Sequence, residues 1–105
     1  MDRKKTIISK LKSFKRDVDK EFKISNMYFF GSRAAGKTHK YSDIDLVIVS
    51  PKFRNLDFFK RGAKMYDYWN LNYPVDFLCY TPKEFNKLKK QVTIVEEAVR
   101  NGVRI

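Results

Sequence analysis

Residues 28–50 read YFFGSRAAGKTHKYSDIDLVIVS, and this stretch predicts how the chain is organised. An apolar run ends at Gly31-Ser32, a polar loop follows, and Asp43-Ile44-Asp45 leads directly into a second apolar run at residues 46–49. Short apolar runs bounded by glycine and polar residues favour strands of a covered sheet. The arrangement therefore indicates a phosphate-holding turn that faces a pair of carboxylates.

Length and charge limit the class of protein. The 105 residues fit one domain over 1–105, with a single core and no room for a second substrate-binding domain. The net charge is +11, and the lysines and arginines are spread over the whole chain. A solvated surface explains that spread, but the positive field would also attract nucleotides, RNA or an acidic protein. Nothing in the sequence specifies an oligomeric state.

The single cysteine and the N-terminus predict a cytoplasmic protein. Cys79 excludes an intramolecular disulfide and fits a reducing compartment. It lies in an apolar run, so we interpret it as a buried side chain rather than a nucleophile. The first 22 residues are too charged for a signal peptide, and no apolar stretch approaches the about 18 residues of a membrane helix. We expect no membrane association.

The flanking segments predict alternating helices and strands. A three-and-four spacing of apolar residues predicts a helix over 3–22, and a second helix over 55–69 with Gly62 permitting close packing. Strands are expected at 24–30, 74–80 and 103–105, and helix starts at Thr81 and Thr93. The expected inner face of the first helix is Ile7, Leu11, Phe14, Val18 and Phe22. The expected inner face of the second is Leu56, Phe59, Ala63 and Tyr66.

Gly31, Gly36, Lys37 and Thr38 match the P-loop pattern, but their surroundings argue against a P-loop. That motif must open a helix whose N-terminal amides hold the phosphates, and only four residues separate Thr38 from the next acidic strand start. A single helical turn beginning at Ser32 needs fewer residues than the helix of a P-loop. Such a turn brings a hydroxyl and free amides together, and Gly31 would let a phosphate approach the backbone.

Asp43 and Asp45 are expected to point to the same face of a strand, because side chains alternate along it. Two carboxylates at the start of an interior strand repel each other, so a compensating charge is needed. Mg²⁺ suits this place because it takes one or two carboxylates together with phosphate oxygens. A pair of strand-end aspartates that simply face water is the alternative.

Taken together, these motifs resemble the nucleotidyltransferase superfamily of DNA polymerase beta. Gly-Ser at a strand end followed by SDIDL is similar to its signature, and the short form resembles the minimal MNT-type members that are often partnered with HEPN-domain proteins. The resemblance covers about residues 24–105. It implies an α/β (α+β) fold with a mixed sheet and helices packed mainly on one side.

The resemblance also implies a site. The third carboxylate would be Asp76 in PVDFLCY, and an aspartate within an apolar run is in any case costly to bury without a partner. Asp43, Asp45 and Asp76 are then the catalytic and metal-binding residues for two Mg²⁺ ions, with Asp76 as candidate base. Gly31, Ser32 and Arg33 would bind the phosphates of ATP. Ala35 departs from the second arginine of many relatives, with Arg33, Lys37 or Lys40 as candidates for the missing charge.

The implied activity is transfer of AMP from ATP to an acceptor hydroxyl. Without a second domain, the resemblance suggests a hydroxyl on a HEPN-type toxin, so that the chain would act as an antitoxin. Two alternatives remain open. One is a binding module that neutralises its partner by occlusion, and the other is an RNA-end nucleotidyltransferase that exploits the positive charge.

Overall fold

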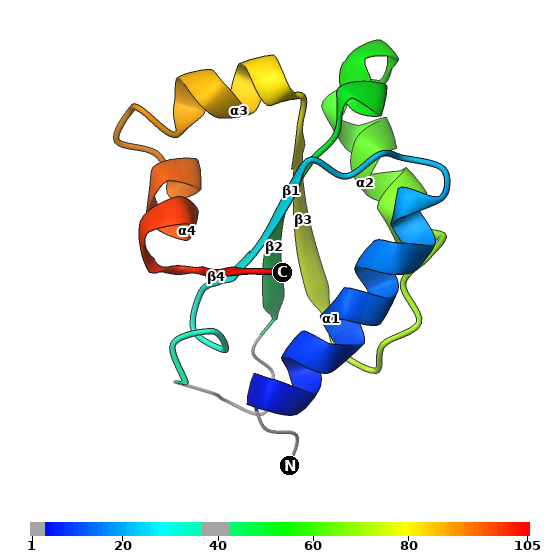
Figure 1. Cartoon of the computed structure of the whole chain (residues 1–105), viewed down its shortest axis with the longest axis vertical. Helices are drawn as coiled ribbons and strands as arrows, with labels where there is room; N and C mark the ends of the chain where they lie inside the picture. Colours follow the sequence, from blue (N-terminus) through cyan, green and yellow to red (C-terminus); the bar gives the residue numbers. More distant parts are fainter. Residues whose placement is uncertain (1–3, 37–42) are drawn as a thin grey trace.

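The structure is a computed structural model that describes residues 4–36 and 43–105. Four strands form one sheet in the order β3-β2-β1-β4. Figure 1 shows helices on both sides of it. In chain order the elements are α1 (Lys4–Asp19), β1 (Asn26–Phe30), β2 (Ile44–Val49), the 3-10 helix η1 (Pro51–Asn55), α2 (Phe58–Tyr66), β3 (Val75–Tyr80), α3 (Pro82–Leu88), α4 (Ile94–Asn101) and β4 (Val103–Arg104).

The sheet is mixed, as the family resemblance implied, but the helices expected mainly on one side cover both of its faces. Strand β1 pairs antiparallel with both β2 and β4, whereas β2 and β3 are parallel. A parallel pair needs a long crossover, and η1 with α2 supplies it. The two strands that carry the acidic residues therefore start at the same end of the sheet, and β1 ends there.

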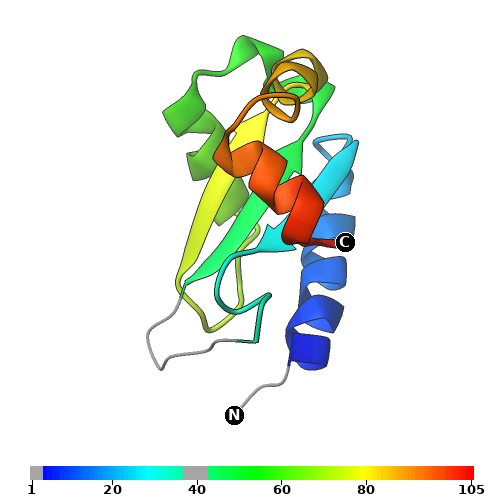
Figure 2. The same cartoon turned by 90° about the vertical axis from the view of Figure 1, so that its left-hand side faces the viewer.

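Two hydrophobic cores lie on the two faces of the sheet. The larger one joins α1 and α2 to alternate strand residues such as Leu46 and Ile48, and the smaller one joins α3 and α4 to Val47 and Val49. Because neighbouring residues of a strand point to opposite faces, a sheet covered on both sides requires apolar side chains at successive positions, and residues 46–49 of β2, after Asp45, supply them. Figure 2, turned by 90° from Figure 1, shows α4 on one face and α1 on the other.

Helix α1 confirms its predicted inner face. Ile7, Leu11, Phe14 and Val18 are buried, and Phe22 is buried beyond the end of the helix. The caps at Thr81 and Thr93 are confirmed as well, because each side chain accepts a hydrogen bond from the third residue of its helix. In the described residues no helix combines the length and the apolar character needed to cross a bilayer.

The prediction for residues 55–69 is wrong in three respects. The helix is shorter than predicted: η1 ends at Asn55, and α2 begins after Asp57, whose side chain accepts a hydrogen bond from the Lys60 amide, and ends at Tyr66. Its buried residues are Arg61 and Met65, whereas Phe59 is 86% exposed and Tyr66 55% exposed. Gly62 does not permit close packing either, because an added Cβ there would meet no atom within 4 Å.

Arg61 explains why α2 turns this face inward. Its Nε donates to the carbonyl oxygens of Phe53 and Leu56 at 3.0 and 2.9 Å, and Nη1 donates to Cys79 O at 3.2 Å. Nη1 also pairs with a carboxylate oxygen of Glu84 at 2.7 Å. One buried guanidinium thus ties η1, α2, β3 and α3 together, and its carbonyl partners are available only if this side of α2 faces the sheet.

We expect Arg61→Ala to lower the free energy of unfolding by about 3 kcal/mol, because several buried carbonyl groups lose a charged donor. Urea denaturation followed by circular dichroism measures the change. Lys60→Ala, one residue away and exposed, is the matched control and should stay within about 0.5 kcal/mol. Equal stability of the two variants would contradict the role given to Arg61.

Candidate functional site

Two aspartates lie side by side at the end of the sheet where β1 stops. Asp45 is the partner of Phe30 across β1 and of Asp76 across β3. Neighbouring strands are about 4.8 Å apart, so the backbones of the two aspartates are held at that spacing. Asp45 is half-buried, Asp76 is exposed, and Asp43 lies exposed one residue before β2 begins. The structure thus brings Asp45 and Asp76 together, with Asp43 two residues away along the chain.

The pKa of Asp45 is raised by its surroundings. Burial raises the pKa of its carboxyl above the ordinary value, and the negative charges of Asp76 and Asp43 raise that pKa further. The charges of Asp76 and Asp43 therefore both act on the Asp45 carboxyl. A raised carboxyl pKa means that the ionised form is disfavoured, so a cation bound here would relieve the repulsion.

Gly31 lies directly against this carboxylate. Its φ of +85° is a left-handed conformation, and a Cβ built on it would collide with Asp45 Oδ2. Only a residue without a side chain can hold both the conformation and the close approach. Gly31 was predicted from its place after an apolar strand, and its contact with Asp45 follows from the antiparallel pairing of β1 and β2.

Residues 31–36 form a turn after β1. The Ala35 amide donates to Gly31 O at 3.0 Å, which closes one helical turn, and the Gly36 amide donates to Arg33 O. Ser32 is exposed on this turn. Lys37 and Thr38, which match the P-loop pattern, lie outside the described residues, as do His39 and Lys40.

Arg33 is buried and stacks on an aromatic ring. Its guanidinium carbon lies 4.9 Å from the centroid of the Tyr73 ring, in the segment just before β3. A guanidinium that stacks through its face can still direct N–H groups from its edge. Sequence reasoning named Arg33 but missed Tyr73, because nothing local marks a tyrosine that meets a residue forty positions away.

The donor set suits a hard divalent cation. Among residues 4–36 and 43–105, no group of three acidic, histidine or cysteine side chains is already close enough to hold a metal ion. Mg²⁺ does not need such a group, because it binds through one or two carboxylates and completes its shell with water and phosphate oxygens. Asp45 and Asp76 match that requirement, and Asp43 is near enough to affect the charge of Asp45.

Cys79 takes no part in this site. The side chain is buried in β3, and burial raises the pKa of its thiol to about 12. A thiol that stays protonated at neutral pH is a poor nucleophile. The prediction of a structural cysteine is confirmed.

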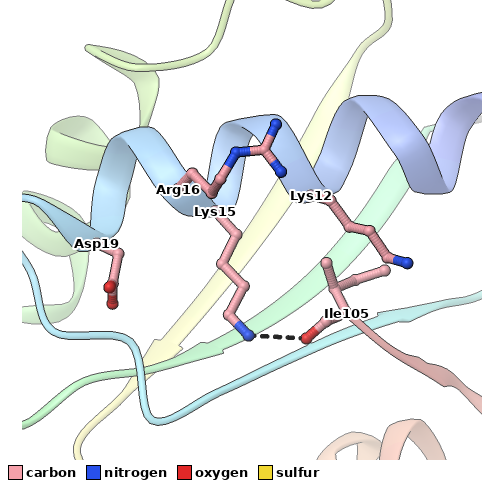
Figure 3. Close-up of a pocket in the computed structure, with 5 residues that line it drawn as sticks. All are labelled: Lys12, Lys15, Arg16, Asp19 and Ile105. Atoms are coloured by element: carbon pink, nitrogen blue, oxygen red, sulfur yellow. Dashed lines mark hydrogen bonds between the residues drawn. The ribbon is translucent and has the colours of Figure 1, made fainter.

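Basic residues gather at a different place. Lys12, Lys15 and Arg16 of α1 line a hollow with Asp19 and Ile105, shown in Figure 3. The Lys15 ammonium donates to Ile105 O at 2.9 Å, and the Ile105 amide donates to Met27 O. Met27 lies four residues before Gly31 on β1, so the hollow is about 13 Å along the strand from the carboxylates. At least one of its cations holds α1 to the sheet.

Comparison with known proteins gives a family match over most of the chain. A family model described as nucleotidyltransferase domain matches residues 11–101. A curated relative from Haemophilus influenzae, named "Probable protein adenylyltransferase MntA", is 36% identical over 73 residues, which are 66% of this chain and 62% of that relative. The chain therefore spans less than two thirds of the relative's length.

Two solved structures share the fold. A "putative nucleotidyltransferase" from Sulfolobus solfataricus superposes with a TM-score of 0.67 at 22% identity, over 96% of this chain and 80% of that one. A structure described as a toxin-antitoxin with AMP-PNP has a TM-score of 0.57 at 23% identity, over 91% of this chain and 69% of that one. The first likeness and the family match confirm the expected polymerase beta-like fold.

We expect Asp45→Asn to raise the urea midpoint at neutral pH in the absence of divalent cations. The folded chain holds the Asp45 proton more tightly than the unfolded chain, so ionisation of this carboxyl lowers stability as the pH rises above its ordinary pKa of 3.8. The gain should vanish below that pH, where both states are protonated. Asp17→Asn, on the exposed face of α1, is the control. A gain that persists at low pH would show that charge is not its cause.

Gly31→Ala and Gly36→Ala form a matched pair, because both glycines have a positive φ but only Gly31 has Asp45 beside it. Strain alone should cost about 1 kcal/mol at each position. The collision should cost Gly31→Ala about 1 to 3 kcal/mol more. In an Asp45→Ala background the two glycine variants should become alike in urea denaturation, and a difference that survives there would refute the contact.

Proposed function

This chain belongs to the nucleotidyltransferase domain family, and on that premise we propose that it transfers a nucleoside monophosphate from a nucleoside triphosphate, ATP in the first place, to a hydroxyl group of a protein. The acceptor oxygen forms a bond to the α-phosphorus. The bond between that phosphorus and the β-phosphate oxygen breaks, and pyrophosphate leaves. The proton of the acceptor hydroxyl passes to a carboxylate of the site.

The observation that carries this proposal is the meeting of Gly31, Asp45 and Asp76 at one end of the sheet. The close approach of Gly31 to Asp45 sets the turn at residues 31–36 beside two carboxylates, which supply charge for the cations that accompany a phosphate. The turn at residues 31–36 places the exposed Ser32 hydroxyl at the same end. Gly31 and Ser32 are therefore assigned to the phosphates, with Arg33 as a neighbouring cation.

The three carboxylates have different tasks because they differ in exposure. Asp45 is half-buried between two strands, so its position is held by the sheet and it serves as the central ligand. Asp43 is exposed before β2 and completes the ligand set for one or two Mg²⁺ ions. When bound, Mg²⁺ would neutralise phosphate charge and lower the pKa of the acceptor hydroxyl.

Asp76 is the candidate base. It is exposed on β3, an edge strand of the described sheet, so an incoming acceptor can reach it from solvent. Asp45 lies opposite Asp76 on the neighbouring strand β2. A carboxylate within reach of the acceptor hydroxyl can accept its proton as the bond to phosphorus forms.

The relatives support a protein acceptor and a toxin partner. The Haemophilus influenzae relative is named as a protein adenylyltransferase, and the structure with AMP-PNP is a toxin-antitoxin. We extend both to this chain as a proposal: it adds AMP to a HEPN-type toxin and so acts as the antitoxin. Exposed aromatic residues on α2 favour a second candidate, in which the chain neutralises its partner by covering it without chemistry.

The test is transfer of label from α-labelled ATP, with Mg²⁺, to a co-expressed HEPN-domain protein. We expect labelling to fall by about a hundredfold or more in Asp45→Ala, because the central carboxylate is lost, and to remain in Asp17→Ala. Labelled protein is separated by gel and counted, and chelation of the metal should abolish the signal.

Each other outcome contradicts the proposal in its own way. Neutralisation of the toxin that survives Asp45→Ala identifies occlusion as the mechanism. Label found on RNA instead of protein identifies the chain as an RNA-end enzyme. If the Asp45→Ala variant labels the acceptor as strongly as the wild type does, Asp45 is not part of the catalytic site.

A further inference from the structure

A groove lies between α2 and the edge strand β3, and the candidate base Asp76 is one of the residues that line it. Its volume is about 310 Å³, and it is lined by Phe58, Phe59, Ala63, Tyr66, Asp76 and Phe77. Asp76 and Phe77 are consecutive in β3, so their side chains point to opposite faces of the strand. The groove, here called the α2–β3 groove, therefore connects an apolar wall on one face with the carboxylate site on the other.

The apolar wall is built of aromatic side chains that remain partly or largely exposed. Phe59 is 86% exposed, Tyr66 55% and Phe58 42%, although all three belong to a regular helix. Single exposed apolar residues are ordinary, but three aromatic residues along one groove form a patch of the kind that marks interaction sites. A partner side chain placed here would remove this surface from water.

The groove is held in shape before any partner arrives. The Tyr66 hydroxyl donates to Val75 O at 2.8 Å, and its ring meets the Phe77 ring edge to face at 4.9 Å. The floor at Gly62 is open, because a Cβ there would meet no atom within 4 Å. The Tyr66 end of the wall is thus held in place before a ligand binds, which limits the entropy lost on binding.

The partner is expected to seat side chains in the groove and not to extend the sheet. Strand β3 presents its outer edge here, but Tyr66 already occupies Val75 O and Arg61 occupies Cys79 O. A strand added to this edge would have to displace both side chains. Apolar side chains that enter from the open side meet no such obstacle.

Charge selects the kind of partner. The chain carries a net charge of +11, which opposes pairing of the groove with a second copy of itself. Lys60 and Lys64 are exposed on α2, each one position after Phe59 and Ala63. A partner that combines acidic and apolar side chains matches both the rim and the wall.

We propose that the α2–β3 groove is the docking surface for the protein acceptor, an acidic segment that seats an apolar or aromatic side chain against Phe59 and presents its hydroxyl to Asp76. This assignment rests on the proposed transfer to a protein hydroxyl. It makes Phe59 a positioning residue for the acceptor, with no contact to the nucleotide.

The experiment uses a fluorescent random copolymer of glutamate and tyrosine as the acceptor probe and polyglutamate as the probe for charge alone. Anisotropy at physiological salt should show tighter binding of the glutamate-tyrosine copolymer than of polyglutamate. Phe59→Ser should weaken copolymer binding by about tenfold, because an aromatic anchor is lost, and leave binding of ATP with Mg²⁺ unchanged. Val92→Ser, which removes a fully exposed apolar residue between α3 and α4, should change neither affinity.

Several results would overturn the groove assignment. They are equal binding of the two polymers, equal affinity of the Phe59→Ser and Val92→Ser variants, displacement of the copolymer by RNA at matched charge, or a dimer that Phe59→Ser dissociates. Failure of the proposed function is distinguishable from all of these. In that case the wild type binds the copolymer through Phe59 but transfers no label to it or to any protein in the presence of ATP and Mg²⁺.

Discussion

The Asp45 carboxylate lies against the bare Cα of Gly31 and beside Asp76, and the rest of this end of the sheet depends on that close approach. A left-handed turn with no side chain is needed at residue 31, and the antiparallel pairing of β1 with β2 brings it to the carboxylate. The cost is a half-buried acidic group whose pKa is raised. Charge repulsion of this kind is typical of functional sites.

The parallel pairing of β2 with β3 places Asp76 beside Asp45. It requires the crossover through α2, and that crossover is held by the buried guanidinium of Arg61. Because β3 is an edge strand of the described sheet, Asp76 is open to solvent while Asp45 is held between two strands. One carboxylate is thus held in place by the sheet, and the other is accessible from solvent.

Charge acts on two scales in this chain. The net charge of +11 gives a long-range field that attracts anions such as nucleoside triphosphates and acidic proteins. At short range the cluster of Asp43, Asp45 and Asp76 is acidic, so an anionic phosphate would need cations to bind beside it. The basic hollow at Lys15 is separate from the carboxylates, and its Lys15–Ile105 contact is a structural one. The exposed aromatic residues of α2, Phe58, Phe59 and Tyr66, add an apolar surface to this charged one.

The sequence by itself determined the strands, the cap residues, the inner face of α1 and the acidic pair at the start of β2. These depend on spacing within a few residues, where alternation and helical periodicity act directly. Asp76 was named from the family resemblance, but only the tertiary structure decided that it pairs with Asp45, that Arg61 and not Phe59 faces the core, and that Arg33 stacks on Tyr73. These contacts join residues that are far apart in the chain. They depend on strand register and on buried hydrogen bonds, and no local sequence pattern encodes either.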